Sequence, residues 1–579
     1  MSNNNRFDVS LPIKYGLIAG VVALFVSVIG MVALFAERDL IAGVLTLGQV
    51  ILFLAPAALS YQAASKAPTG KNGTALLYGA ITGFVAALPL ISLIYVYTLI
   101  DLRQFFPNVS PSLMEILTFG QGPGLGSLIL LVVSTVLGLV SAGLYLLPDK
   151  YRRPIMSGLV GTLVVGMFSE ILTERLRFFF GARFVAIVIT SKALRPLTAL
   201  FIFVVVTAIA YWWIQRGEQA RERLTQRTTA RDPRMRWIGI GLLIIFFLIL
   251  PLLLGTYLSE VVNNVLIFAL MGFGLNIVVG FAGLLDLGYV AFFAIGAYTM
   301  AILTSEGALG VGGLSFWLAV PICVLAGVIG GLILGVPVLR MRGDYLAIVT
   351  LGFGEIIRIL ALSDLLKPYI GGAQGVLQIP KPTIVGLDLI KPDQFYYVVL
   401  IGVLIAAFVS WRLSGARLGR QWMAMREDED VAEAMGIKLV NSKLLAFAIG
   451  ASFAALSGAI FASKLTSIFP HSFNLLISIN VLCLIIVGGM GSLPGVIVGA
   501  LFLVGLPELL REFAEYRLLM YGVLLIVMML VRPEGIWPSA VRRRELHVYE
   551  QDDSARRPAA EPLPKAETRE PGMEGPPHL

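Results

Sequence analysis

The stretch Gly274-Leu-Asn-Ile-Val-Val-Gly-Phe-Ala-Gly-Leu-Leu-Asp-Leu-Gly-Tyr289 is an apolar run that three glycines interrupt, at positions 280, 283 and 288. Backbone that unwinds at membrane depth is tolerated only where it is buried in protein or lines a wet cavity. Asp286 lies in this break, and because a carboxylate inside a membrane is costly, it is a candidate functional residue. The alternative is that Asp286 only caps a helix beginning near Leu287, at the cytoplasmic interface. We call residues 274–289 the first glycine break and expect a broken membrane helix there.

The whole chain has the composition of a membrane protein. It has 579 residues, of which 57% are hydrophobic and 14% charged, and its mean hydropathy is +0.86. Soluble domains carry about 25% charged residues, so an ordinary soluble protein is excluded. The net charge of +8 is spread over a long apolar chain, which excludes nucleic-acid binding driven by net charge. Two cysteines in apolar runs and three scattered histidines predict neither a disulfide framework nor a metal cluster.

Apolar stretches long enough to cross a membrane recur along the chain. A bilayer core of about 30 Å needs roughly 20 apolar residues in a helix, and about ten stretches after residue 236 meet this requirement. Before residue 215 there are about five or six more. We therefore expect an all-α polytopic membrane protein with about 15–16 transmembrane helices. The first stretch, residues 16–36, is expected to be a span and not a cleaved signal peptide, since no small-residue cleavage motif closes it.

Loop charges predict the orientation of these spans. Basic residues in short loops face the cytoplasm, and the richest such loop, residues 215–236, contains seven arginines. With this loop inside and about ten spans after it, Arg340, Arg342 and the C-terminal tail also fall inside. The long segment 364–394 falls outside. We therefore expect loop 215–236 and the C-terminal tail to be cytoplasmic.

The same features divide the chain into four parts. Residues 1–214 are expected to be an N-terminal transmembrane module of unknown role, in which we find no motif. Residues 215–236 are an arginine-rich cytoplasmic linker or, alternatively, an ordinary solvated loop. Residues 237–539 carry every motif and are expected to form a second transmembrane domain. Residues 540–579 are rich in charge and proline and almost free of apolar residues after Val548, so they are expected to be a disordered cytoplasmic tail.

A second glycine-rich stretch, Val487-Gly-Gly-Met-Gly-Ser-Leu-Pro-Gly495, aligns with residues 279–285 at an offset of 208. Valine, two glycines and leucine recur in register. Paired glycine-broken segments in corresponding parts of a chain indicate the pathway of a transporter. The alternative is chance, because apolar glycine-rich segments align easily. We call residues 487–495 the second glycine break.

Two charged residues occur inside the apolar stretch that follows Arg342. Glu355 and Arg358 are three residues apart, so they lie on one face of the predicted helix. Each charge would be costly alone in hydrocarbon, but together they can neutralise each other or reach a polar cavity. They form either a structural ion pair near the outer surface or a pair that lines the pathway.

A cytoplasmic stretch, residues 415–437, predicts a short helix of about five residues. Asp430 and Glu433 fit a capping box, and Gly436 fits the stop after the last turn. Such a short helix is unstable alone in water, so it must pack against something. A groove in a partner protein is one possibility, with Val431, Ala432 and Met435 exposed beside a charged rim. The alternative is an amphipathic loop on the bundle itself.

Together with Arg532-Pro-Glu-Gly-Ile-Trp537, these stretches resemble a known family, the permease subunits of branched-chain amino acid ABC importers, in its LivM-like branch. The resemblance covers about residues 237–540. It rests on the joint order of G-L-N-x-V-V-G-x-A-G, G-D-Y-L-A-I-V-T-L-G-F-G-E-I-I-R, R-E-D-E-x-x-A-E-A-M-G-I and R-P-E-G-x-W. Residues 1–236 would be an addition that the family core lacks.

The resemblance implies a complex of two permease subunits and two ABC ATPase subunits, fed by an extracytoplasmic solute-binding protein. ATP would be bound by the partner subunits, so we expect no cofactor, metal or catalytic site on this chain, which lacks the G-x-x-x-x-G-K-[ST] motif. Residues 420–437 then resemble the segment that docks in an ATPase groove, and we call them the coupling segment. Its expected contact residues are Arg420, Arg426, Glu427, Asp428, Ala432, Met435 and Gly436.

The expected substrate is a branched-chain or related amino acid. The resemblance also implies that the chain lies in the plasma (inner) membrane, whose lipid is its expected partner. The expected pathway residues are Asn276, Gly280, Gly283, Asp286, Tyr289, Tyr298, Glu355 and Arg358. One alternative keeps the family and changes the substrate to urea or a short amide. Another is an ion-coupled secondary carrier, which would need neither a cytosolic docking helix nor ATPase partners. A structural scaffold is a further alternative, which the glycine-broken helices disfavour.

Overall fold

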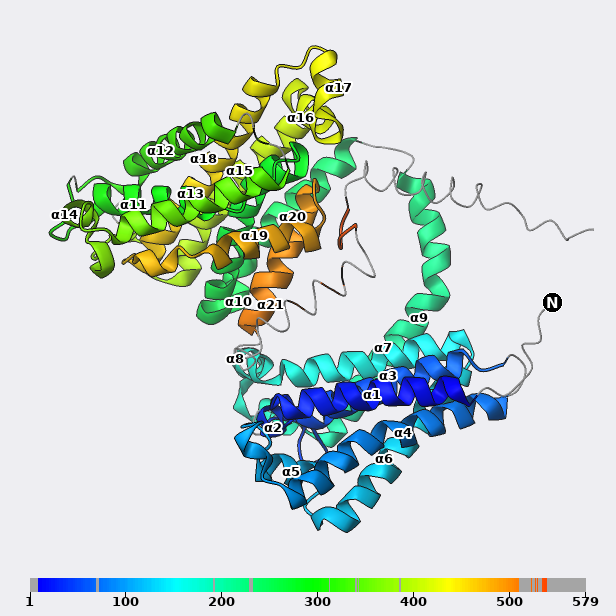
Figure 1. Cartoon of the computed structure of the whole chain (residues 1–579). Helices are drawn as coiled ribbons and strands as arrows, with labels where there is room; N and C mark the ends of the chain where they lie inside the picture. The colour runs from blue at the N-terminus through cyan, green and yellow to red at the C-terminus, as the bar shows by residue number, and fades with distance from the viewer. Residues whose placement is uncertain are drawn as a thin grey trace, which may run out of the picture. The chain divides into compact units, whose positions relative to one another are not determined.

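The computed structural model describes residues 9–68, 72–190, 193–228, 233–311, 313–338, 341, 343–384, 387–509, 522, 526, 528 and 534–538. The chain divides into two compact units, Met1–Arg236 and Trp237–Leu579. Figure 1 shows both as helical assemblies. Residues 229–232 of the predicted linker, Arg340, Arg342 and the predicted tail lie outside the described residues.

The first unit is a helical bundle with a few very short strands. Its elements are α1 (Ser10–Val28), α2 (Met31–Ala36), β1 (Asp39–Ile41), β2 (Leu45–Thr46), α3 (Leu47–Ser65), α4 (Asn72–Leu99), η1 (Leu102–Gln104), α5 (Pro111–Leu117), α6 (Gly122–Leu146), α7 (Asp149–Met167), α8 (Ser169–Val188), β3 (Ile189–Thr190), β4 (Ala193–Leu194) and α9 (Pro196–Thr228). Helices α1, α3, α4 and α6 pack side by side (Figure 1).

Close packing of α4 on α6 follows from small residues at their contact. Gly79 and Gly83 are four residues apart, and a Cβ added at Gly83 would collide with the carbonyl oxygen of Ser134. The Ser134 hydroxyl donates a hydrogen bond to the Gly83 carbonyl, at 2.7 Å. Small residues at this spacing let two membrane helices bring their backbones together, and the hydroxyl bond adds to the contact.

A four-stranded sheet in the order β2-β1-β4-β3 accompanies the first bundle. The strands are two or three residues long, and Ile41 on β1 pairs with Leu194 on β4 in parallel. The sheet brings residues about 150 positions apart to one place, and the all-α prediction did not include it. The helices nevertheless dominate, so the predicted class is confirmed.

The second unit contains the motif-bearing helices. Its elements are α10 (Pro233–Leu275), η2 (Asn276–Phe281), α11 (Val290–Thr304), α12 (Phe316–Val338), α13 (Asp344–Leu362), α14 (Lys367–Ile370), η3 (Gly372–Gln374), β5 (Thr383–Ile384), β6 (Leu387–Asp388), α15 (Pro392–Gly415), α16 (Arg417–Glu427), α17 (Glu429–Ala434), α18 (Leu439–Leu465), η4 (Pro470–Ser472), α19 (Leu475–Gly488), α20 (Leu493–Ala500), η5 (Leu501–Gly505) and α21 (Leu506–Leu509).

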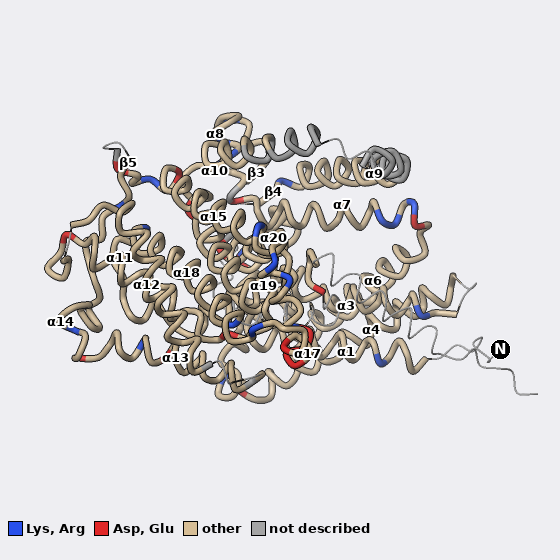
Figure 2. Tube along the Cα trace, turned by 90° about the horizontal axis from the view of Figure 1, so that it is seen from above, with Lys and Arg blue, Asp and Glu red and all other residues tan. Residues whose placement is uncertain are grey.

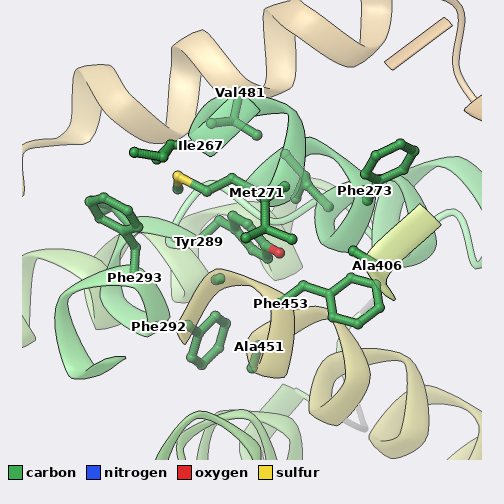
Figure 3. Close-up of a cluster of buried hydrophobic side chains, with 14 of the residues drawn as sticks. Ile267, Met271, Phe273, Tyr289, Phe292, Phe293, Ala406, Ala451, Phe453 and Val481 are labelled. Carbon is green, nitrogen blue, oxygen red and sulfur yellow. The ribbon is translucent and has the colours of Figure 1, made fainter. Parts of the chain in front are cut away.

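Helix α18 is the centre of this unit, with α11 and α12 packed along it. A Cβ added at Gly327 or Gly331 would press on Ala451 or Phe447 of α18, so both glycines allow α12 to approach closely. The interior is apolar and aromatic: Figure 3 shows Met271, Phe293 and Phe453 around the ring of Tyr289. The core thus sits where α10, α11, α18 and α19 meet.

The number of membrane helices agrees with the prediction once two differences are considered. Within the described residues, eleven helices are long and apolar enough to cross a membrane, and two shorter apolar ones, Val290–Thr304 and Leu493–Glu508, accompany them. The spans predicted at 237–258 and 261–281 both lie within α10, where a kink at Gly255, with a φ of +65°, separates two helices. The last predicted span, 518–531, lies almost wholly outside the described residues.

The bend in α10 is stabilised from another helix. Pro251 has no N–H, so the carbonyl of Phe247 lacks its helical partner. The hydroxyl of Tyr396 on α15 donates to that carbonyl at 3.0 Å. The orphaned acceptor is therefore satisfied just before the kink at Gly255.

Candidate functional site

The first glycine break is a π-helix followed by irregular backbone. Helix α10 passes into η2 at Asn276, and the next helix, α11, starts only at Val290. Gly283 adopts a φ of +73°, which a residue with a Cβ rarely adopts. At 1.5 Å per residue, α11 is only about 22 Å long, less than the bilayer core of about 30 Å. The break therefore includes irregular backbone within a predicted span.

Asn276 connects the first break to the second. Its Oδ1 accepts a hydrogen bond from the backbone N–H of Gly491, at 2.8 Å. Gly280 lies beside this bond, because an added Cβ would collide with Asn276 Oδ1 and lie 2.8 Å from the nitrogen of Gly491. The two stretches related by sequence are thus direct neighbours in space.

The second break is closed by the segment that contains Trp537. Helix α19 ends at Gly488, and Gly489 follows with a φ of +116°. The N–H groups of Ile536 and Trp537 donate to the carbonyls of Val487 and Gly488, at 2.8 and 2.9 Å. Two of the last carbonyls of α19, which a helix end leaves unpaired, are satisfied in this way.

Arg426 connects the coupling segment to the first break. Its Nη1 donates to the carbonyl of Gly280 at 2.8 Å. A Cβ added at Gly283 would lie 2.5 Å from Cγ of Arg426, so the absent side chain makes room for the arginine stem. The guanidinium also pairs with Glu427, at 2.8 Å. One predicted contact residue thus lies against two predicted pathway residues.

Helix α17 is the acidic turn of the coupling segment, and it appears red in Figure 2. Its N-cap is Asp428, whose Oδ1 accepts from the N–H groups of Asp430 and Val431 at 2.9 and 3.0 Å. The prediction that Asp430 caps the helix is therefore wrong, because Asp430 lies inside the first turn. Gly436 follows the helix with a φ of +87°, as predicted for the stop.

The faces of α17 differ from the prediction at one residue. Val431 and Met435 are exposed, at 59% and 79% of their surface, but Ala432 is only 3% exposed. Ala432 therefore faces its own protein and does not lie beside Val431 and Met435 on the surface. The reason is a buried anchor: Lys443 of α18, 3% exposed, pairs with Glu429 at 2.8 Å and holds α17 on the bundle.

The rest of the coupling segment is anchored in the same region. The indole N–H of the buried Trp422 donates to the carbonyl of Ser442, at 2.9 Å. Arg420 differs from Arg426, because its Nη1 bonds Gly415 just before its own helix, at 3.0 Å. The segment is therefore a rigid corner, with Arg426 directed to the first break.

Asp286 is fully buried and has one free carboxylate oxygen. Its Oδ1 accepts from the N–H of Gly288 at 2.9 Å, and its Oδ2 has no hydrogen-bond partner among the described residues. The interpretation that Asp286 caps a helix beginning near Leu287 misplaces the start of that helix, because α11 begins at Val290. The N–H of Val290 donates to the hydroxyl of Ser478, at 2.9 Å, and not to Asp286. Asp286 orders the turn before the helix.

Two neighbours fix this turn in the core. The hydroxyl of Tyr289 donates to the carbonyl of Gly450 at 2.7 Å. The Thr350 hydroxyl accepts from the N–H of Leu287, at 3.0 Å. Gly288 lies against the backbone of α13 so closely that a Cβ would overlap Thr350. Tyr289 is therefore buried in the packing and offers no exposed group to a solute in this conformation.

Glu355 and Arg358 form the predicted ion pair on α13. Arg358 Nε donates to both carboxylate oxygens of Glu355 at 3.0 Å, and Nη2 donates to Oε1. Their side chains keep 43% and 27% of their exposure. Glu355 also borders a small cavity of about 140 Å³, which we call the side cavity. It is lined by Leu287, Val290, Leu351, Gly354, Glu355, Phe473 and Leu475.

Tyr298 lies close to the same place. Its ring packs on Phe473 with 5.5 Å between centroids, and its buried hydroxyl has no hydrogen-bond partner among the described residues. The predicted residues therefore gather in two places: Asn276, Gly280 and Gly283 lie near Arg426, and Glu355 lies at the side cavity, with Tyr298 behind its wall.

Sequence reasoning missed several members of these sites. A buried ion pair of Lys443 could have been predicted, since a lysine at the start of an apolar run requires a partner. Thr350, Ser478 and Phe473 carry none, because a hydroxyl or an aromatic residue is ordinary in such a helix.

Comparison with known proteins gives the chain its family. Residues 257–531 match the family described as branched-chain amino acid transport system / permease component. The high-affinity branched-chain amino acid transport system permease protein LivM of Escherichia coli (strain K12) is 41% identical over 376 residues, which cover 54% of this chain and 87% of that protein. LivM of Salmonella typhimurium is 38% identical, with the same coverage.

A second type of permease is also similar. LivH of Escherichia coli (strain K12) is 26% identical over 308 residues, 48% of this chain and 95% of that protein. No solved structure matches the chain significantly. Several helices of the first unit precede the matched residues. The chain belongs to the branched-chain amino acid transport permeases, multi-pass membrane proteins of ABC transport systems and not enzymes, and it is LivM-like.

Proposed function

We propose that this chain is one of two different permease subunits of an ATP-driven importer that carries branched-chain amino acids through the plasma membrane. The similarity to both LivM and LivH supports a second, LivH-like permease as its partner. ATP is hydrolysed by two separate ABC ATPase subunits, and an extracytoplasmic solute-binding protein delivers the substrate. Loop 215–236 and the tail face the cytoplasm. The observation that carries the proposal is the contact of Arg426 with the first glycine break.

The coupling segment is where the ATPase subunits dock. Exposed Val431 and Met435 form an apolar spot next to the acidic first turn of α17. A short helix with an apolar face suits the groove of a partner protein, where such residues serve as anchors. Ala432 takes no part in the docking, because it is buried against its own bundle.

Movement of the docked segment reaches the pathway through Arg426. The anchors at Trp422 and Lys443 make the segment move as a unit. Arg426 bonds the carbonyl of Gly280, and two residues of the same break, Asn276 and Gly280, lie against Gly491. Because interfaces of this kind repack between discrete arrangements, a small displacement at the ATPase can change both breaks together.

The remaining pathway residues act around this connection. Gly283 gives the arginine its space, and Asp286 with Tyr289 orders the turn that starts α11. Glu355, Arg358 and Tyr298 lie at or beside the side cavity. Each of these residues either contacts the solute or stabilises the backbone segment that contacts it.

A pull-down from detergent extract tests the docking. Met435→Arg places a charge on the apolar spot, and because Met435 is 79% exposed, the fold should tolerate it. Wild type is expected to capture both ATPase subunits, and Met435→Arg to lose them. Val440→Arg, which changes an exposed residue of α18 outside α17, is the matched control and should retain them. Capture that is indifferent to Met435→Arg, or absent for wild type, contradicts the proposal.

A further inference from the structure

The side cavity is a small apolar space with one charged wall. It lies between the starts of α11 and α19 and the middle of α13. Apart from Glu355, its lining consists of leucine, valine, phenylalanine and glycine residues. Gly354 contributes space, and an added Cβ there would already lie 3.2 Å from Gly288 Cα. Ligand sites are commonly of this kind, mostly apolar with a few polar groups that fix orientation.

The volume of the side cavity suits a short branched hydrocarbon chain. At about 140 Å³ it is close to the apolar cavity of roughly 150 Å³ that takes up benzene, which has six carbons. The side chain of leucine, isoleucine or valine has three or four carbons, so each can enter. Urea has no hydrocarbon part and would leave the apolar wall unused.

The ion pair beside the cavity can bind further charges. A carboxylate offers about four lone-pair sites and a guanidinium five N–H donors. The hydrogen bonds between Glu355 and Arg358 use only three of these acceptor sites. They involve Nε and Nη2 of the arginine, so Nη1 makes no bond to Glu355. Both side chains remain partly exposed. An ammonium group can therefore reach Glu355 while a carboxylate reaches Arg358.

We propose that Glu355, Arg358 and the side cavity form a binding site for a zwitterionic amino acid with a branched aliphatic side chain. The side chain enters between Leu351 and Phe473, the α-ammonium group binds Glu355, and the α-carboxylate binds Arg358. This site rests on the proposed permease function and assigns the residues that recognise its substrate. A merely structural pair on a helix surface would contribute little to stability and would have no preference for a solute.

Filling the cavity tests the apolar half of the site. The complete complex is reconstituted in proteoliposomes with saturating solute-binding protein, and uptake of leucine and of valine is measured separately. Leu351→Phe should lower leucine uptake at least tenfold and valine uptake clearly less, since one methylene in an apolar pocket changes selection by about 10- to 200-fold. Ile348→Phe, on the exposed side of the same helix, is the matched control and should leave the ratio unchanged. Equal losses for both substrates, or no loss, overturn the site.

Enlarging the cavity keeps the test decisive if the bulky variant does not assemble. Leu351→Ala should raise the uptake of leucine relative to valine or admit a larger apolar amino acid, phenylalanine. An unchanged ratio of leucine to valine uptake together with no gain in phenylalanine uptake would overturn the proposal.

Exchanging the charges tests the polar half. Glu355→Arg with Arg358→Glu restores an ion pair of reversed direction, so a structural pair should recover wild-type uptake. A site that orients a zwitterion should stay at least tenfold impaired, because the ammonium group now meets an arginine at the cavity wall. Recovery of full uptake would therefore count against the site. In each variant, retained ATPase capture separates failure of this site from failure of the permease function.

Discussion

In the variant Arg426→Ala, the coupling segment loses its hydrogen bond to the first glycine break. A hydrogen bond to a charged group contributes about 1.5–3 kcal/mol to stability. The Arg426 side chain keeps 24% of its exposure, so water screens part of this interaction and the lower end of that range applies. A loss of about 1.4 kcal/mol changes an equilibrium tenfold. We therefore expect substrate uptake per ATP hydrolysed to fall about tenfold.

The assay measures uptake and ATP hydrolysis in the same proteoliposomes. Docking does not depend on Arg426, since the exposed residues of α17 remain, so ATPase subunits should still be captured and should still hydrolyse ATP. Arg420→Ala is the matched control, because Arg420 bonds Gly415 next to its own helix and leaves the break untouched. Arg426→Lys keeps the charge and should recover part of the coupling.

Two results would refute this reasoning. The first is an unchanged ratio of uptake to hydrolysis in Arg426→Ala, which would mean that the contact with Gly280 carries no movement. The second is an equal loss of uptake per ATP in Arg420→Ala, which would assign the effect to charge on the segment and not to the contact.

Two further variants test the packing. Lys443→Ala leaves Glu429 without its buried partner, which costs about 3–5 kcal/mol for a fully buried pair and less here, because Glu429 keeps 20% of its exposure. Hydrogen exchange of residues 428–436 should speed up at least tenfold, and exchange at the wild-type rate would argue against the anchor. Gly83→Ala forces a methyl group against Ser134 and should destabilise the α4–α6 contact by about 1–3 kcal/mol, lowering the melting temperature in detergent. Gly73→Ala, with open space around its Cα, should not, and equal shifts for both would contradict the argument.

Sequence patterns revealed the parts of the molecule that depend on composition and on glycine. Apolar length predicted the helices, and the glycines at 280 and 283 predicted the first break, because glycines clustered inside an apolar run weaken a helix at that point. The relation between the two breaks was also visible as a repeat at offset 208. What the repeat could not reveal is that Asn276 reaches Gly491 directly, since this depends on how α10 and α19 cross.

Other features depend on tertiary packing and left no pattern. The cap of α17 was placed at Asp430 because Asp430 and Glu433 have the spacing of a capping box, and only the backbone before Glu429 shows that the cap is Asp428. A six-residue helix is too short for periodicity to say which side is buried, so Ala432 was misplaced. Strands of two or three residues, such as β3 and β4, are too short for an alternating pattern.

The two hydrogen bonds between residues 536–537 and the end of α19 set different limits on substitution at neighbouring positions of the motif R-P-E-G-x-W. Both bonds are donated by peptide amides, so position 536 contributes a backbone N–H in addition to an isoleucine side chain that packs against the core. The variable letter in R-P-E-G-x-W is therefore closed to proline, which has no amide hydrogen to give. At the neighbouring position only glycine fits, because a Cβ at Gly535 would lie 2.5 Å from Gly489 Cα. A protein engineer can thus exchange Ile536 for another apolar residue while leaving Gly535 unaltered.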